Sequence, residues 1–212
     1  MKFPHGPGFH DLTWPTPNGE LLRLTLHLPG QTANAPCVLA LHYGGPPVGF
    51  YGRGLLETLV VPAWEELDAV CVAPVSLGGD WLAPANVAAV LALVVELEAT
   101  FQTAPTRKIV TGYSLGAAGC WHLAEHRDTR FALVVPMAGA PPNRNANFTA
   151  PVHVLHSRAD QLFPFAEVEA AVTHLVARGL PVSFHALDGA DHFNVAAFVP
   201  ALRELAPVFD SR

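Results

Sequence analysis

From residue 21 onward, short apolar runs alternate with longer segments whose apolar residues have helical spacing. Leu21–Leu28 (LLRLTLHL) alternates apolar and polar positions, which predicts a strand with one wet face, early in a sheet or at its edge. Cys37–Leu41 (CVLAL) is apolar throughout and stops at a segment rich in Gly and Pro, so it predicts a buried strand that ends in a loop. The first twenty residues, rich in Pro and Gly, are expected to form an irregular segment on the surface.

Beyond residue 50, strand-like apolar runs alternate with segments of helical spacing. The predicted strands cover residues 69–73, 108–111, 132–136, 151–156 and 181–187. The predicted helices cover residues 55–67 (with a kink or restart at Pro62), 84–101, 115–126, 165–178, and 194 towards 208. Strands that alternate with crossover helices predict one α/β domain over residues 1–212, with a mostly parallel central sheet and helices on both faces. The functional loops of such a sheet gather at the carboxyl ends of the strands.

Composition narrows the class of protein. Half of the 212 residues are apolar and 14% are charged, so a core of ordinary size forms without a disulfide or metal to hold it. The formal net charge is −6, and no run of basic residues occurs, which argues against a nucleic-acid-binding protein. The three cysteines form no CxxC pair, and Cys37 and Cys71 lie in or beside apolar runs, where we expect small buried side chains.

Metal binding and membrane insertion are not expected either. No HExxH motif occurs, and His153 and His156 would point to opposite faces of one short strand. The N-terminal residues lack the apolar core of a secretory signal. The most apolar segment, residues 83–97, is short for a membrane span and contains Glu96. We therefore expect a soluble, cytoplasmic protein without stable membrane insertion.

The motif with the clearest chemistry is GxSxG at residues 112–116 (GYSLG), in a chain with only five serines. It follows the predicted strand 108–111 and precedes the predicted helix 115–126, which is the strand-turn-helix setting of a nucleophile elbow. The residues two before and two after the serine must be small, so that the strand and the helix can approach each other. The N–H groups and positive dipole end of the helix then point at any oxyanion beside Ser114. Ser114 is the candidate nucleophile; the alternative is a glycine-rich turn with an incidental serine.

An activated serine needs a base, and the base needs a carboxylate to orient it. The loop after the predicted strand 151–156 contains one carboxylate, Asp160, and the loop after the predicted strand 181–187 contains His192. These two residues are the candidate acid and base, in the order Ser, Asp, His along the chain. Asp188 stays open as the acid, as do a turn or capping role for Asp160 and a packing role for His192.

Other titratable residues are less suitable. They lie within predicted strands (His153, His156, His185), on the helix after the motif (His122, His126), or next to His192 without reach to its Nδ1 (Asp191).

An oxyanion hole is expected from two backbone N–H groups. One belongs to Leu115, which follows the nucleophile, and the other belongs to Tyr43 or Gly44 in the loop after the strand CVLAL. We expect His42 to hold this loop by hydrogen bonding rather than to take part in chemistry.

The segments LHYGG, GYSLG, SRADQLFP and GADHF together resemble the α/β-hydrolase superfamily, from about Leu21 onward. The short length and the segment order look most like the carboxylesterase/lysophospholipase group, which includes acyl-protein thioesterases. Dienelactone-hydrolase-like and depolymerase-like esterases are close relatives in pattern. The resemblance implies a Ser114–Asp160–His192 triad that hydrolyses a small-molecule ester or thioester through an acyl-enzyme, without a cofactor.

The chain departs from these families at two positions. The group usually has Gly after the oxyanion-loop histidine, where this chain has Tyr43, so the second N–H donor stays undecided and the acyl pocket is expected to be narrower. A dienelactone hydrolase is expected to have Cys at the elbow, so Ser114 counts against that specific activity.

The expected access to the site follows from loop length. The segment between the predicted strands 132–136 and 151–156 is too short for a helical lid, which predicts an open site for small to medium soluble esters. Trp81, Leu82 and Phe163 should lie near the functional edge of the sheet as pocket-lining candidates, with ordinary loop packing as the alternative. Two other functions remain open: a peptidase-like or acyl-transferring relative with the same triad, and a non-catalytic ligand-binding protein on the same scaffold.

Overall fold

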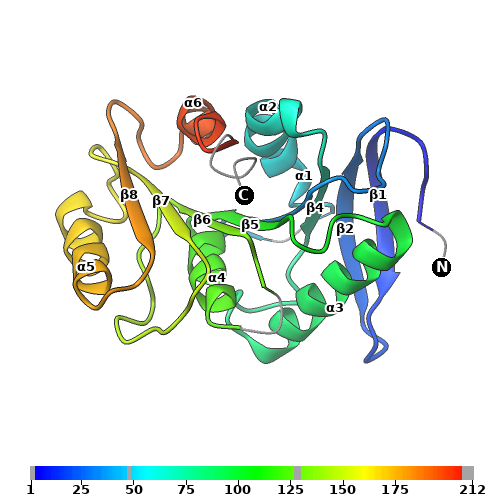
Figure 1. Ribbon diagram of the computed structural model, residues 1–212, viewed down its shortest axis with the longest axis horizontal. Helices are drawn as coiled ribbons and strands as arrows, with labels where there is room; N and C mark the ends of the chain where they lie inside the picture. Colours follow the sequence, from blue (N-terminus) through cyan, green and yellow to red (C-terminus); the bar gives the residue numbers. More distant parts are fainter. Residues whose placement is uncertain (1–2, 47–48, 127–129, 207–212) are drawn as a thin grey trace.

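The computed structural model of the protein describes residues 3–46, 49–126 and 130–206. The strands in these ranges are β1 (Gly8–Pro15), β2 (Leu21–Leu28), β3 (Cys37–Leu41), β4 (Val70–Pro74), β5 (Lys108–Tyr113), β6 (Leu133–Met137), β7 (Val152–Ser157) and β8 (Val182–Leu187). They form one sheet in the order β1-β2-β4-β3-β5-β6-β7-β8 (Figure 1). Strand β2 runs antiparallel to both of its neighbours, β1 and β4, and the strands from β4 to β8 in this order are parallel. The predicted mostly parallel sheet is confirmed.

Helices cover both faces of this sheet. They are α1 (Arg53–Leu55), the π-helix η1 (Leu56–Val60), α2 (Val61–Trp64), the 3-10 helix η2 (Glu65–Leu67), α3 (Pro84–Phe101), α4 (Leu115–Ala124), α5 (Phe165–Ala177), the 3-10 helix η3 (Val195–Phe198) and α6 (Val199–Arg203). Figure 1 shows α3, α4 and α5 on one face, and α1, α2 and α6 on the other. The expected arrangement of helices on both faces is therefore confirmed.

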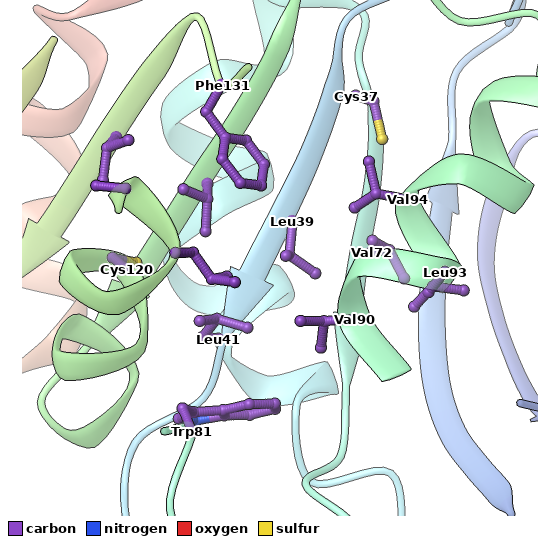
Figure 2. Close-up of a cluster of buried hydrophobic side chains, with 14 of the residues drawn as sticks. Cys37, Leu39, Leu41, Val72, Trp81, Val90, Leu93, Val94, Cys120 and Phe131 are labelled. Carbon is purple, nitrogen blue, oxygen red and sulfur yellow. The ribbon is translucent and has the colours of Figure 1, made fainter. Parts of the chain in front are cut away.

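Strands β3 and β4 contain no charged or hydroxyl side chain. All five residues of each strand are buried, because helices cover both of their faces. Leu39 and Val72 pair across the two strands, and Val90 and Leu93 of α3 belong to the same apolar cluster (Figure 2). Trp81 lies where this cluster meets the carboxyl end of β3 (Figure 2).

Helix α3 is, among the described residues, the one helix long and apolar enough to cross a membrane by length and composition. Eight of its residues are buried against the protein core. Its apolar composition is thus that of a core helix.

The N-terminal segment is a correction to the sequence-based expectation of an irregular first twenty residues. Gly8–Pro15 forms β1, which pairs along its whole length with β2, and Trp14 is buried. The prolines near this strand lie at its end or outside it, where an edge strand loses no ladder hydrogen bond. Because β1 takes the edge, β2 is the second strand of the sheet.

The other elements follow the predicted order. Pro62 lies in the first turn of α2, so the predicted kink is a restart after the π-helix. The last predicted helix begins as the 3-10 turn η3 and continues as α6 to Arg203, whereas residues 207 and 208 lie outside the described residues. Residues 138–151, all of them described, contain no helix, so a lid is absent from this segment.

Candidate active site

Ser114 occupies a sharp turn between β5 and α4. Its backbone has φ 54° and ψ −112°, a conformation that costs a non-glycine residue about 1–3 kcal/mol. The N–H of Ser114 donates to the carbonyl oxygen of Met137 at the end of β6, at 2.9 Å, which fixes the turn to the sheet. The hydroxyl is thereby held above the carboxyl edge of the sheet, half-buried.

Two glycines make this turn possible. A Cβ on Gly112 would lie 2.5 Å from the carbonyl oxygen of Gly116, and a Cβ on Gly116 would overlap the backbone of Leu41 in β3. The strand, the helix and the neighbouring strand therefore approach more closely than any side chain allows. This is the steric reason that the sequence pattern predicted.

The structure brings Ser114, His192 and Asp160 together. The Oγ of Ser114 lies 2.9 Å from Nε2 of His192, and Nδ1 of His192 lies 2.8 Å from Oδ2 of Asp160. With a neutral ring, Nδ1–H donates to the carboxylate and Nε2 accepts the serine proton. The Asp160 side chain is fully buried, and its other oxygen, Oδ1, accepts hydrogen bonds from the N–H groups of Leu162 (2.9 Å) and Phe163 (2.8 Å).

The rival carboxylates have other roles. Asp188, the alternative acid, has a side chain that is 88% exposed and lies 3.4 Å from Arg158. Asp191 accepts hydrogen bonds from the N–H groups of Phe193 and Asn194, both at 2.9 Å, and so shapes the turn around His192.

The backbone of His192 is held on both sides by side chains that the sequence did not single out. The amide oxygen of Gln161 accepts the N–H of His192 at 2.9 Å, and the hydroxyl of Tyr113 donates to its carbonyl oxygen at 3.0 Å. Burial, followed by the nearby Asp160 and Asp191, raises the pKa of Tyr113, so the phenol keeps the proton that it donates. Tyr113 is a variable position of GxSxG, whereas Gln161 was detectable as the polar neighbour of Asp160.

The candidate oxyanion hole lies between the loop after β3 and the start of α4. A Cβ on Gly44 would lie 3.9 Å from the Cβ of Leu115, so the two backbones are neighbours. None of the hydrogen bonds within the described part of the chain uses the N–H groups of Tyr43, Gly44 or Leu115. Their position beside Ser114 makes these N–H groups the candidate donors to an oxyanion.

His42 holds the oxyanion loop, as expected. Its Nδ1–H donates to the carbonyl oxygen of Tyr43 at 2.7 Å, and its Nε2 accepts the N–H of Ser76 at 3.1 Å. Burial lowers the pKa of His42 below its ordinary value, which keeps the ring in the neutral form that this pair of hydrogen bonds requires.

A pocket of about 420 Å³ opens beside the nucleophile. It is lined by Tyr43, Gly44, Tyr113, Ser114, Leu162, His192, Phe193 and Val195. No Asp, Glu, Lys or Arg is among these described lining residues. The three pocket candidates from the sequence are not among these lining residues.

Trp81, Leu82 and Phe163 do not line the pocket. Trp81 is 2% exposed, and its ring nitrogen donates to the carbonyl oxygen of His42 at 2.9 Å, so it supports the oxyanion loop from inside the core. The N–H of Leu82 donates to Asp80 in a turn. The ring of Phe163 lies 5.6 Å from the His192 ring and is partly covered by the core on the α3 side.

The fold, the serine at the elbow and the His–Asp pair define an α/β-hydrolase with the site of a serine hydrolase. A model of the dienelactone hydrolase family matches residues 78–202, more than half of the chain, and the chain belongs to this family. The matched segment contains Ser114, Asp160 and His192. The superfamily resemblance seen in the sequence is thereby confirmed, within a family named above as a close relative in pattern.

Solved structures support the fold. The chain is similar to a thermostable esterase (18% identity, TM-score 0.74), with 96% of this chain covering 62% of that one. It is similar to the S-formylglutathione hydrolase of Staphylococcus aureus (16% identity, TM-score 0.74; 97% of this chain, 98% of that one). It is also similar to an alpha-beta serine hydrolase homologue from Coxiella burnetii (19% identity, TM-score 0.70; 97% and 98%). Among curated protein sequences none matches significantly.

Proposed function

We propose that the protein hydrolyses carboxylic esters or thioesters of small to medium acyl groups through an acyl-enzyme on Ser114. The observation that carries this proposal is the continuous hydrogen-bonded path from Ser114 Oγ through His192 to the buried Asp160. Family membership supports hydrolysis as the reaction.

The proposed reaction has two halves. As Ser114 Oγ attacks the carbonyl carbon of the substrate, His192 Nε2 takes its proton, and Asp160 stabilises the imidazolium that forms. The oxyanion of the tetrahedral intermediate accepts hydrogen bonds from the N–H of Leu115 and from Tyr43 or Gly44. His192 then protonates the departing alkoxide or thiolate. In the second half, a water molecule that loses its proton to His192 attacks the acyl-enzyme. His192 then returns this proton to Ser114 Oγ as the acyl–oxygen bond breaks and the acid leaves.

The pocket supports an uncharged substrate. Its described lining contains no Asp, Glu, Lys or Arg, so a charged group bound there would lose water without gaining an ion pair. The serine at the elbow, where a dienelactone hydrolase is expected to have cysteine, supports an ester other than dienelactone. The substrate reaches the site without a helical lid, because the segment between β6 and β7 contains no helix.

This mechanism needs no cofactor, because the chain supplies the nucleophile, the base and the N–H donors. The proposed partner is the small-molecule ester or thioester alone. We place the protein in the cytoplasm, and the three free cysteine thiols support a reducing compartment.

A fluorophosphonate followed by peptide mapping tests the proposal directly. We expect one covalent label, on Ser114, and its loss in Ser114→Ala. Ser183→Ala is the matched control, because Ser183 is exposed on β8 and remote in the sheet order from β5. Absence of label on wild-type Ser114 would contradict the proposal and favour a non-catalytic binding protein.

A substrate panel then separates the reaction classes. p-Nitrophenyl esters, acyl thioesters and aminoacyl anilides should give turnover with the first two classes. Turnover confined to the anilides would assign a peptidase-like function instead.

A further inference from the structure

Two large apolar side chains lie exposed at the mouth of the active-site pocket. Leu162 is 56% exposed and Phe193 is 72% exposed, and both line the pocket that contains Ser114. Among the described residues, the other exposed large apolar side chains are Leu21, Val95 and Val176, which lie on β2, α3 and α5. The two residues at the pocket therefore form an exposed apolar pair next to the reacting groups, which we call the apolar lip.

The apolar lip is attached to the catalytic loops by backbone hydrogen bonds. The N–H of Leu162 donates to Oδ1 of Asp160, and the N–H of Phe193 donates to Oδ1 of Asp191, both at 2.9 Å. The Phe193 ring also packs edge-on against the His192 ring, with 5.7 Å between centroids. The positions of both side chains are thus set by the same turns that set the acid and the base.

The pocket next to the apolar lip is also largely apolar. Tyr43, Tyr113 and Val195 give it apolar walls, and its described lining has no charged side chain other than the imidazole of His192 when protonated. Consider an apolar chain attached to a carbonyl group at Ser114. The pocket would shield the first part of this chain from water, and Leu162 and Phe193 would shield the part beyond it. Exposed apolar surface next to a binding site gains free energy when such a chain covers it.

We propose that Leu162 and Phe193 bind the apolar chain of the substrate, which makes uncharged esters with a medium-length alkyl chain the preferred substrate class. This inference rests on the proposed ester hydrolysis. Its measurable consequence is a rise of kcat/KM with chain length. The rise is about fourfold per methylene where the chain is enclosed and about twofold where one side of it stays in water.

The test compares p-nitrophenyl acetate with p-nitrophenyl octanoate, below the concentration at which the octanoate forms micelles. We expect wild-type protein to prefer the octanoate, and we expect Leu162→Ser and Phe193→Ser each to lower the octanoate-to-acetate ratio of kcat/KM by about fivefold. Leu21→Ser is the matched control, because Leu21 is 68% exposed on β2, outside the pocket, and this ratio should stay at the wild-type value. Both lip side chains are exposed, so the melting temperature should change little.

Each remaining outcome overturns the proposal in a distinguishable way. Acetate turnover with a ratio that the lip variants leave unchanged would overturn the role of the apolar lip and leave ester hydrolysis intact. Absence of turnover on every ester would overturn both. A rate that rises only once micelles or phosphatidylcholine vesicles are present would assign the apolar lip to a lipid surface and overturn its role as a chain-binding site.

Discussion

Ser114 and His192 meet at 2.9 Å, yet the chain holds the two residues in place by different means. The nucleophile depends on backbone shape: Gly112 and Gly116 leave no room for a side chain between β5, α4 and β3. The base depends on side-chain hydrogen bonds: Asp160 binds its ring, and Gln161 binds its backbone N–H.

We therefore expect changes at the two places to affect different properties, stability at the elbow and turnover in the acid and histidine loops. An added atom at the elbow has to displace backbone, so its cost appears first in stability. A lost polar atom in the acid and histidine loops leaves the sheet and helices unchanged, so its cost appears first in turnover. Three experiments test this distinction, and a fourth tests how two buried histidines make stability depend on pH.

Asp160→Asn should have the largest effect. The Asn oxygen can still accept the N–H groups of Leu162 and Phe163, while its NH2 group faces Nδ1 of His192 and favours the wrong ring tautomer. We expect kcat to fall by about 10⁴-fold with a melting temperature close to wild type, as measured by ester hydrolysis and thermal unfolding. A similar loss of kcat in Asp188→Asn would contradict the assignment of the acid.

Gly116→Ala tests the elbow. The new Cβ would overlap the backbone of Leu41, so the free energy of unfolding should fall by about 3 kcal/mol or more in urea titrations. Gly30→Ala is the control, because a Cβ there has nothing within 4 Å. Equal stability of the two variants would contradict the close contact between Gly116 and the backbone of Leu41.

Gln161→Met removes the acceptor for the His192 N–H while keeping a side chain of similar length. As a positioning residue, Gln161 should affect kcat by about fivefold, with KM nearly unchanged, because a displaced imidazole is a poorer base for a substrate that binds normally. Gln161→Glu, which retains an acceptor oxygen, should recover part of the loss. Gln31→Met, at an exposed site in the loop before β3, should have no effect. A change confined to KM would contradict a positioning role.

The smallest effect concerns pH. Burial lowers the pKa of His42 and of His156 below the ordinary value of 6.5. Below that pH the unfolded chain binds protons more readily than the folded chain, so the free energy of unfolding is highest above pH 6.5 and falls on acidification. Urea titrations at about pH 5 and about pH 7 measure this slope, and His156→Gln should make it shallower. A slope that is unchanged in both His42→Gln and His156→Gln would contradict this source of acid sensitivity.

The sheet, and the three residues that the structure brings together at its edge, are predictable from the sequence because both depend on local patterns. β2, β3 and α3 have the bounds that apolar spacing and Pro84 indicated. Ser114, Asp160 and His192 each follow a recognisable strand, and parallel strands bring their carboxyl ends to one edge.

Two features, β1 and the position of Trp81, are not predictable from a short stretch of sequence, because both depend on contacts between distant segments. The composition of residues 8–15 does not predict β1, because its pairing with β2 makes it a strand. The position of Trp81 soon after β4 predicts a residue of the pocket. Its side chain instead packs where Gly119 has no Cβ, and a Cβ at that position would lie 2.6 Å from the Cβ of Trp81. Such a contact joins two segments far apart in the chain, so only the folded structure reveals it.

The three cysteines have a practical consequence. Cys37, Cys71 and Cys120 are buried and free, and burial raises the pKa of Cys37 to about 12 and the pKa of the other two as well. Alkylating reagents act on exposed thiolate, so the native fold offers them almost no target. A cysteine introduced on the surface would therefore accept a fluorophore or spin label selectively, without prior removal of the natural thiols.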